Sequence, residues 1–226
     1  MYQGAVRGVL EGMVLQMSQD ISEPKIPSKN AEYFTEAVGH DASQIYVKAK
    51  RLCEIFVVIA LAPPVLLTIA PIALAILWTM GRPVLVKQER VGKGGRIFRQ
   101  LRLRTRVEGS PSEHPRMTLL GRFLEDSCLA ELPQLWNVLV GEMSIVGPCP
   151  ESPREADFYR DKVPNYELRQ SVRPGLTGYA QVYLESASGS TRIEYDLHYI
   201  RHMDAALDFM IVWHSLFPGT ERHRHV

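Results

Sequence analysis

Four side chains able to do chemistry lie between residues 125 and 131 of this 226-residue chain. Glu125, Asp126 and Glu131 carry carboxylates, and Cys128 carries a thiol. Carboxylates and thiols act as nucleophiles, and a carboxylate can also hold a divalent cation. Glu131 falls in the first turn of a helix predicted to begin near residue 128, where free amide groups attract phosphate. The position therefore suits chemistry on a phosphorylated substrate.

Structural roles compete with this chemistry. Glu131 could merely cap the helix, although Cys128 replaces the Ser or Thr that would complete a reciprocal capping box. Asp126 is predicted to cap the helix rather than to react. Apolar residues recur at three-to-four-residue spacing and predict one buried helix face: Leu129, Leu132, Leu135 and Trp136.

The segment from residue 87 to residue 106 is strongly basic, although the whole chain has a formal net charge of only +1. Glu89 is its one acid, and its eight basic residues are Lys87, Arg90, Lys93, Arg96, Arg99, Arg102, Arg104 and Arg106. Such a segment is expected to contact an anionic partner. Arginine forks suit substrate phosphates, and a solvated face above anionic lipid explains the charges equally well. Nucleic acid is not expected, because no aromatic residues are interleaved with the charges and no recognition helix accompanies them.

Residues 52–80 form an apolar stretch in which Glu54 is the one charged side chain, and the stretch is long enough to enter a bilayer. As a straight helix it would extend about 44 Å, beyond a hydrocarbon core of about 30 Å. Pro63, Pro64 and Pro71 predict a break near its middle, since each removes a backbone donor. Basic residues flank both ends, which favours both ends at the cytoplasmic face. The sequence therefore predicts a helix-break-helix hairpin in one leaflet, with a kinked spanning helix as the alternative.

Cysteine and glycine patterns add little chemistry. Cys53, Cys128 and Cys149 are too few and too scattered for a disulfide framework or a paired zinc site, and they suit a reducing, cytoplasmic setting. The Gly-Lys-Gly-Gly sequence at residues 92–95 lacks the spacing of a nucleotide-binding loop, so it predicts a turn.

Ordered sequence blocks run through most of the chain from residue 50 to residue 216. They are Gly81 to Gly92, Phe98 to Thr105, Gly121 to Leu124, Glu131 to Leu139, Gly141 to Pro148 and Arg173 to Val182, followed by Tyr195, Asp196, Tyr199 and Asp208. This series resembles the bacterial sugar transferases, which are monotopic phosphoglycosyl transferases. The resemblance implies transfer of a sugar phosphate from a nucleotide sugar to polyprenyl phosphate. In that family an aspartate attacks the donor diphosphate, a covalent phosphosugar intermediate forms, and the adjacent glutamate helps to hold magnesium.

The chain departs from the family pattern where the chemistry occurs. Ala130 stands at the nucleophile position, and a methyl group can neither attack phosphorus nor bind a metal. Glu125 and Cys149 stand where the family has phosphate-binding arginines, and Glu125 reverses the charge. Glu131 matches the metal-holding glutamate, so magnesium is expected only if the protein is active. These differences predict a member released from the catalytic requirement.

Other polar residues match family positions expected to contact substrate. They are Arg102, Arg104, Arg116, Arg122, Gln134 and Arg173. Rescue by another nucleophile stays open, with Glu131 attacking from a shifted position. A misplacement of about 1 Å can cost on the order of a hundredfold in rate.

The sequence thus predicts a helix-rich α/β, monotopic membrane protein at the cytoplasmic face of the inner membrane. Its expected parts are an N-terminal extension (1–47), a membrane hairpin (48–82), a small cytoplasmic globular domain (83–217) and a tail (218–226). The first functional hypothesis is a catalytically deficient protein of polysaccharide or glycoconjugate assembly. It would bind membrane lipid such as polyprenyl phosphate, a nucleotide sugar, or a partner such as an active sugar transferase. An active transferase using Glu131 and a membrane-tethered binder of anionic surfaces are the alternatives.

Overall fold

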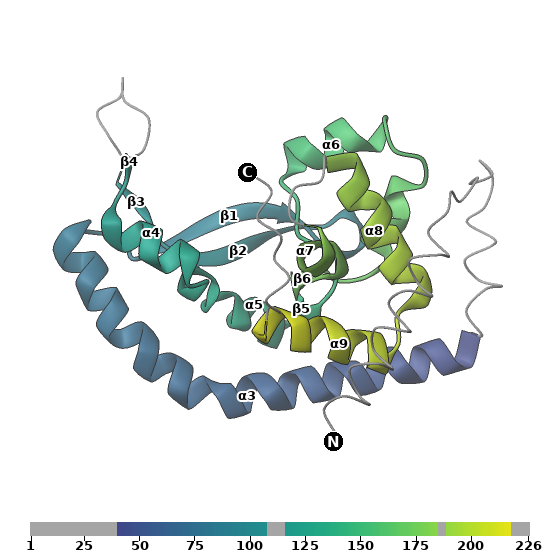
Figure 1. Cartoon of the computed structure of the whole chain (residues 1–226), viewed down its shortest axis with the longest axis horizontal. Helices are drawn as coiled ribbons and strands as arrows, with labels where there is room; N and C mark the ends of the chain where they lie inside the picture. Colours follow the sequence, from purple (N-terminus) through teal and green to yellow (C-terminus); the bar gives the residue numbers. More distant parts are fainter. Residues whose placement is uncertain (1–39, 108–115, 185–188, 218–226) are drawn as a thin grey trace, which may run out of the picture. The chain divides into compact units, whose positions relative to one another are not determined.

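The computed structural model describes residues 40–107, 116–184 and 189–217, with side chains from residue 45 onward (Figure 1). Every described residue belongs to one compact unit. Helices predominate, and the described strands form three two-stranded sheets. The predicted helix-rich α/β class is therefore confirmed. The predicted tail and most of the predicted N-terminal extension lie outside the described residues.

The longest element is helix α3, His40–Thr79, which contains the predicted apolar stretch. Its span from Ile45 to Thr79 is long and apolar enough to cross a membrane. Figure 1 shows α3 as a bowed helix. Side chains on its inner face recur at helical spacing and are buried or half-buried: Glu54, Val58, Val65, Ile69, Ile72, Ile76 and Met80. The outer face exposes large apolar side chains, among them Leu52, Phe56, Leu66, Leu67, Leu74 and Trp78.

The structure differs from the predicted hairpin, because α3 continues through Pro63, Pro64 and Pro71 without a break. All three prolines lie on the exposed, outer side of the helix. A proline ring clashes with the carbonyl of the preceding turn, so the helix opens on the proline side and bends away from it. The Thr68 hydroxyl also donates to the carbonyl of Pro64 at 2.8 Å, a contact that favours bending. The prolines therefore curve the helix instead of ending it.

The basic segment forms an antiparallel hairpin of β1 (Leu85–Val91) and β2 (Ile97–Leu103). Its register pairs Leu85 with Leu103 at one end and Val91 with Ile97 at the other. The intervening turn contains a single 3-10 turn, η1 (Lys93–Gly95), in which Gly94 and Gly95 have positive φ. The turn predicted from the Gly-Lys-Gly-Gly sequence is thus confirmed, with glycine where other residues would be strained.

The remaining elements surround this hairpin. In chain order they are β3 (Arg106–Val107), β4 (Arg116–Met117), α4 (Leu119–Asp126), η2 (Leu129–Glu131), α5 (Gln134–Val140), β5 (Ser144–Val146), α6 (Pro153–Arg160), η3 (Tyr166–Ser171), β6 (Gly175–Thr177), α7 (Tyr179–Tyr183), α8 (Gly189–His202) and α9 (Ala205–Leu216). Strands β3 and β4 pair antiparallel, and β5 and β6 pair parallel. The middle and the second end of α3 join the core. One cluster contains Val58, Phe98, Val138 and Met143, and another contains Ile76, Met80, Leu103, Leu124 and Ala130.

The helix predicted to begin near residue 128 begins later. Residues Leu129–Glu131 form the separate turn η2, and α5 starts at Gln134, directly after Pro133. Proline is tolerated at a helix start but interrupts the hydrogen bonds of a helix interior, which separates the two elements. Trp136 was predicted to be buried but is 58% exposed. Glu131 therefore lies in a short turn and not in the first turn of α5.

Candidate functional site

Turn η2 carries Ala130, which the family resemblance predicts to stand at the nucleophile position and whose side chain is fully buried. It joins the cluster formed by Ile76, Met80, Leu103 and Leu124. Cys128, two residues before Ala130, has a left-handed backbone conformation with φ 57°. The methyl group thus fills a position in the apolar core, and it offers no atom that could react.

Helix α4 reaches this turn because Gly121 lies against the backbone of Thr105. A Cβ atom at Gly121 would stand 1.8 Å from the Thr105 carbonyl oxygen, so a larger residue would push the helix away. The Thr118 hydroxyl accepts from the Gly121 amide at 2.9 Å and caps the helix. This packing brings Glu125 to Thr105, whose hydroxyl donates to the Glu125 carboxylate at 2.7 Å.

Glu131 faces Arg102 across the short gap between η2 and β2. The closest guanidinium nitrogen and carboxylate oxygen are 3.4 Å apart, and the Glu131 side chain is 40% exposed. Burial raises the pKa of Glu131, Arg102 opposes this shift, and the charge of Glu125 adds to it. The Nε atom of Arg102 is buried and has no hydrogen-bond partner among the described residues. Arg102 therefore pairs with Glu131, and Glu125 lies close enough for its charge to raise the pKa of Glu131.

Cys149, the other position expected to carry an arginine, belongs to a second group of side chains. Its carbonyl accepts from Arg169 at 2.6 Å, and burial raises the pKa of its thiol. Arg169 is 6% exposed and contacts the carboxylates of Glu151 at 2.5 Å and Asp196 at 2.8 Å. The Tyr166 hydroxyl donates to Glu151 at 2.5 Å. A buried network thus holds the loop after β5 against η3 and α8.

The other predicted substrate residues have varied surroundings. Arg104 is 7% exposed, and its guanidinium donates to the carbonyls of Arg106, Arg82 and Met80 at 2.9, 2.8 and 3.4 Å. Arg173 donates to the carbonyl of Gly141 at 2.8 Å. Gln134 is buried at the start of α5, whereas Arg116 on β4 and Arg122 on α4 are exposed. Their roles in substrate binding stay predictions, and the contacts of Arg104 favour holding the turn after α3.

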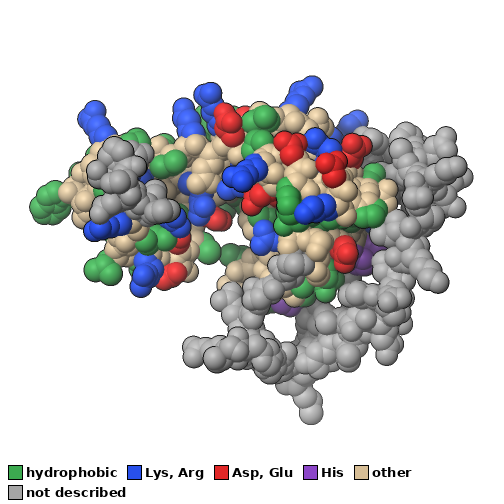
Figure 2. Space-filling view, turned by 90° about the horizontal axis from the view of Figure 1, so that it is seen from above, with side chains coloured by type: hydrophobic (Ala, Val, Ile, Leu, Met, Phe, Trp, Pro, Cys, Tyr) green, Lys and Arg blue, Asp and Glu red, His purple; other side chains and the backbone are tan. Residues whose placement is uncertain are grey.

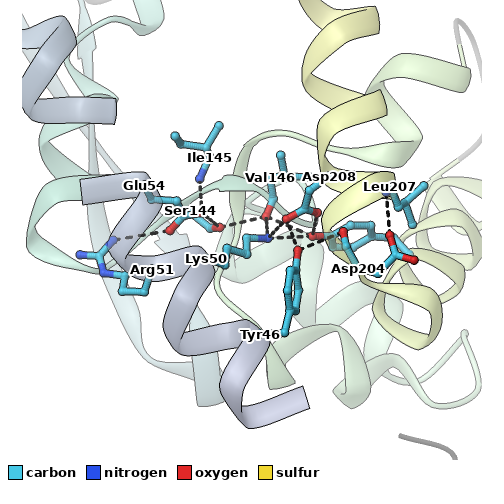
Figure 3. Close-up of polar contacts among 11 residues, drawn as sticks. Tyr46, Lys50, Arg51, Glu54, Ser144, Ile145, Val146, Asp204, Leu207 and Asp208 are labelled. Atoms are coloured by element: carbon cyan, nitrogen blue, oxygen red, sulfur yellow. Dashed lines mark hydrogen bonds and ion pairs between the residues drawn. The ribbon is translucent and has the colours of Figure 1, made fainter. Parts of the chain in front are cut away.

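Sequence reasoning missed the polar cluster that fixes the first part of α3 (Figure 3). Asp208 of α9 accepts from Tyr46 at 2.5 Å and from Tyr199 at 2.7 Å, and it pairs with Lys50 at 2.8 Å. Glu54 accepts from the Ser144 hydroxyl and from the Ile145 amide at 2.9 Å. Glu54 was a signal for such a contact, because a carboxylate within an apolar helix needs buried partners. The sequence could not identify those partners, which are about 90 residues away.

A second missed residue is Asn137, which is 1% exposed and links α5 to β2. Its side chain accepts from the Leu101 amide at 3.0 Å and donates to the Arg99 carbonyl at 2.9 Å. It also donates to Glu142 at 2.7 Å. Asn137 therefore holds the hairpin against the helix that follows η2, and so positions Arg102 beside Glu131.

The residues around Ala130 do not fit a resident magnesium ion. Magnesium requires several oxygen ligands in octahedral geometry, usually one or two carboxylates with substrate phosphates and water. Glu131 is already paired with a guanidinium, the Thr105 hydroxyl bonds Glu125, and residue 130 supplies only a methyl group. In the described part of the chain, no three His, Cys, Asp or Glu residues are grouped as metal ligands.

The pKa of Asp196 supplies a test of the buried network. Burial raises this pKa from 3.8 to about 6, and Arg169 opposes the shift. A raised carboxyl pKa contributes stability below pH 4 that is lost as the pH rises through 6. Relative to Asp196→Asn, the free energy of unfolding of the unchanged protein is expected to fall by about 1 kcal/mol between pH 5 and pH 7.5. Thermal melting of both proteins in detergent at the two pH values measures this. Parallel pH profiles would show that Asp196 does not titrate in this range.

A two-part architecture therefore emerges, in which a bowed apolar helix joins a small α/β body with arginines and carboxylates near the helix end. Comparison with known proteins identifies the class. The sequence model of the bacterial sugar transferase family matches residues 45–221, and the chain belongs to this family.

Three relatives are between 31% and 37% identical to the chain over the residues that align. The UDP-glucose:undecaprenyl-phosphate glucose-1-phosphate transferase of Escherichia coli is 37% identical over 71% of this chain and 39% of its own length. The UDP-N-acetylgalactosamine-undecaprenyl-phosphate N-acetylgalactosaminephosphotransferase of Aeromonas hydrophila is 33% identical over 77% of this chain and 44% of its own length. The exopolysaccharide production protein ExoY of Sinorhizobium fredii is 31% identical over 73% of this chain and 80% of its own length. The chain thus spans about two fifths of the length of the first two relatives.

Proposed function

We propose that this chain is a membrane-bound sugar transferase homologue of polysaccharide or glycoconjugate assembly that does not itself transfer sugar phosphate. The observation that carries the proposal is Ala130, a fully buried methyl group at the nucleophile position. Covalent catalysis requires an attacking group, and loss of such a group typically lowers rates by several orders of magnitude. The names of the relatives indicate that UDP-sugars and undecaprenyl phosphate are the ligands to test.

Two further positions support the loss of side chains that would bind the phosphates of the donor. Glu125 would repel a diphosphate where the family pattern has an arginine, and Thr105 holds this carboxylate in place at 2.7 Å. Cys149 is a half-buried neutral side chain at the second arginine position. Among the predicted substrate residues, the arginines proposed to remain for a lipid phosphate or a nucleotide sugar are Arg102 and Arg173. In this proposal the protein binds such a ligand, or a catalytically active partner, without turnover.

The proposal includes a monotopic arrangement in which α3 enters and leaves the same face of the bilayer. Near one end of α3, Lys50 pairs with Asp208 of α9, and near the other end Ile76 packs with Leu103. A single body that contacts both ends cannot lie on both sides of a membrane about 30 Å thick. The bowed helix would therefore dip its exposed apolar face into one leaflet, although it is not a hairpin of two helices. Basic residues at both flanks favour the cytoplasmic face of the inner membrane.

The proposed parts follow the sequence boundaries: an N-terminal extension (1–47), the membrane element (48–82), the globular domain (83–217) and a tail (218–226). The main competing function is an active transferase that uses Glu131. Its favouring observation is that Glu131 is 40% exposed and adjacent to the lost nucleophile. Two observations count against an active Glu131. Its carboxylate is paired with Arg102, and burial raises the pKa of Glu131. A binder of anionic surfaces without a polyprenyl preference is the remaining candidate.

Nucleotide release tests the proposal. Purified protein is incubated in detergent with a panel of UDP-sugars, magnesium and undecaprenyl phosphate, and UMP is measured over time. We expect no release above the protein-free background, while an active relative assayed in parallel releases UMP. Release that disappears in Glu131→Gln would overturn the proposal in favour of the displaced carboxylate. The Glu167→Gln variant, which removes an exposed carboxylate of η3, is the matched control.

A further inference from the structure

Basic residues near the two ends of α3 have different surroundings. At the first end, Lys50 contacts Asp208 at 2.8 Å and the Val146 carbonyl at 2.8 Å. Arg51 donates to the carbonyls of Val138 and Leu139 at 2.7 and 3.0 Å. These charges are therefore used inside the protein, where they fix the helix to α5, β5 and α9.

At the second end, one buried arginine gathers the backbone around a set of exposed arginines. Arg104 donates to the carbonyls of Arg82 and Arg106, which places these two residues beside each other just after α3. The pairing of β3 with β4 brings Arg116 next to Arg106, since Arg116 pairs with Val107. The close packing of Gly121 on Thr105 adds Arg122 of α4.

Arg82, Arg106, Arg116 and Arg122 have exposed side chains, and we name this set the arginine patch. Figure 2 shows Lys and Arg side chains around this end of the molecule, at the left of the view. The neighbouring acids cancel only part of the charge, because Glu125 and Asp126 of α4 carry two negative charges against the four positive charges of the arginine patch.

Large apolar side chains are exposed beside the arginine patch. Trp78, near the end of α3, is 92% exposed, and Leu119 and Phe123 of α4 are 87% and 59% exposed. A soluble nucleotide would satisfy the arginines and leave these apolar surfaces in water. A bilayer satisfies both, because tryptophan favours the interface and arginines reach the phosphates above it.

We propose that the arginine patch is a docking surface for anionic phospholipid headgroups, which anchors the second end of α3 by charge where the first end is anchored by internal ion pairs. This inference rests on the membrane placement of α3 proposed above. Each basic residue near an anionic surface strengthens binding about fivefold, so loss of three arginines is expected to weaken it roughly a hundredfold. The effect is expected to fade with salt.

Vesicle flotation of the full chain tests the inference. The variant Arg82→Gln/Arg106→Gln/Arg122→Gln is compared with the control Lys93→Gln/Arg96→Gln/Arg99→Gln, which removes the same charge from the opposite end of the β1–β2 hairpin, where all three residues are exposed. Vesicles contain phosphatidylcholine alone or with 30% phosphatidylglycerol. We expect both variants to bind neutral vesicles like the unchanged protein, and only the first to lose the roughly hundredfold gain from phosphatidylglycerol.

Several outcomes would overturn the inference. They are equal loss in both variants, no gain from phosphatidylglycerol in the unchanged protein, or displacement from anionic vesicles by soluble UDP. The inference is also rejected if trace undecaprenyl phosphate in neutral vesicles strengthens binding more than phosphatidylglycerol does. That result would assign the arginine patch to the polyprenyl lipid. Failure of the unchanged protein to bind any vesicle would instead reject the membrane placement of α3, so the two proposals fail in different ways.

Discussion

Replacing Arg169 by methionine is expected to lower the free energy of unfolding by about 3–5 kcal/mol. Arg169 is the cation between the buried carboxylates of Glu151 and Asp196, and the side chains of all three are at most 8% exposed. Methionine keeps much of the length and removes the charge, so two carboxylates would be left in a poorly solvated site. Their repulsion and desolvation then oppose folding.

Thermal melting in detergent measures this loss, which corresponds to a decrease in Tm of roughly 6–20 °C for a chain of this size. The triple variant Arg169→Met/Glu151→Gln/Asp196→Asn is the control, because it removes the unpaired charges together with the cation. We expect it to recover a large part of the stability. A Tm of Arg169→Met within about 2 °C of the unchanged protein would mean that water reaches this network freely, contrary to its burial.

Restoring an aspartate at residue 130 is expected to fail as a single change. Ala130→Asp places a carboxylate in the cluster of Ile76, Met80, Leu103 and Leu124, close to Glu131. Such burial costs roughly 1–3 kcal/mol or more. Adding Glu125→Arg supplies a cation nearby and is expected to recover part of that stability.

The expected effect of these substitutions on the rate of UMP release is larger than their effect on stability. The triple variant Ala130→Asp/Glu125→Arg/Cys149→Arg is expected to release UMP at least about 10²–10³ times faster than Ala130→Asp alone, since even one donor aimed at developing charge typically contributes such a factor. UMP release from UDP-sugars with undecaprenyl phosphate measures both variants. Equal activity of the single and triple variants would show that arginines at residues 125 and 149 are irrelevant to the site.

The sequence predicted the features that depend on local pattern. The apolar stretch became one long helix, and the glycine-rich turn closed the β1–β2 hairpin. The break at Pro63, Pro64 and Pro71 was wrong because proline acts through the side of the helix on which it lies. All three lie on the outer face, where the helix can open, and the inner face still packs from Val58 to Ile76.

The site was predictable only as a set of positions. Family resemblance located Ala130, Glu125 and Glu131, but it could not reveal that Arg102 pairs with Glu131 or that Thr105 holds Glu125. The network around Arg169 also escaped prediction, because Glu151 and Asp196 are distant in sequence and meet only after α8 packs on η3. Side-chain partners across such separations depend on tertiary packing, which a single sequence pattern does not encode.

Intact-protein mass spectrometry tests the central claim most directly. The protein is incubated with UDP-sugar and magnesium without polyprenyl phosphate, so that any covalent phosphosugar intermediate accumulates on the chain. We predict a mass unchanged from that of the untreated protein, because Ala130 cannot form a bond to phosphorus. A mass increase equal to one sugar phosphate, mapped by peptide analysis to Glu131 or to Cys128, would contradict this account.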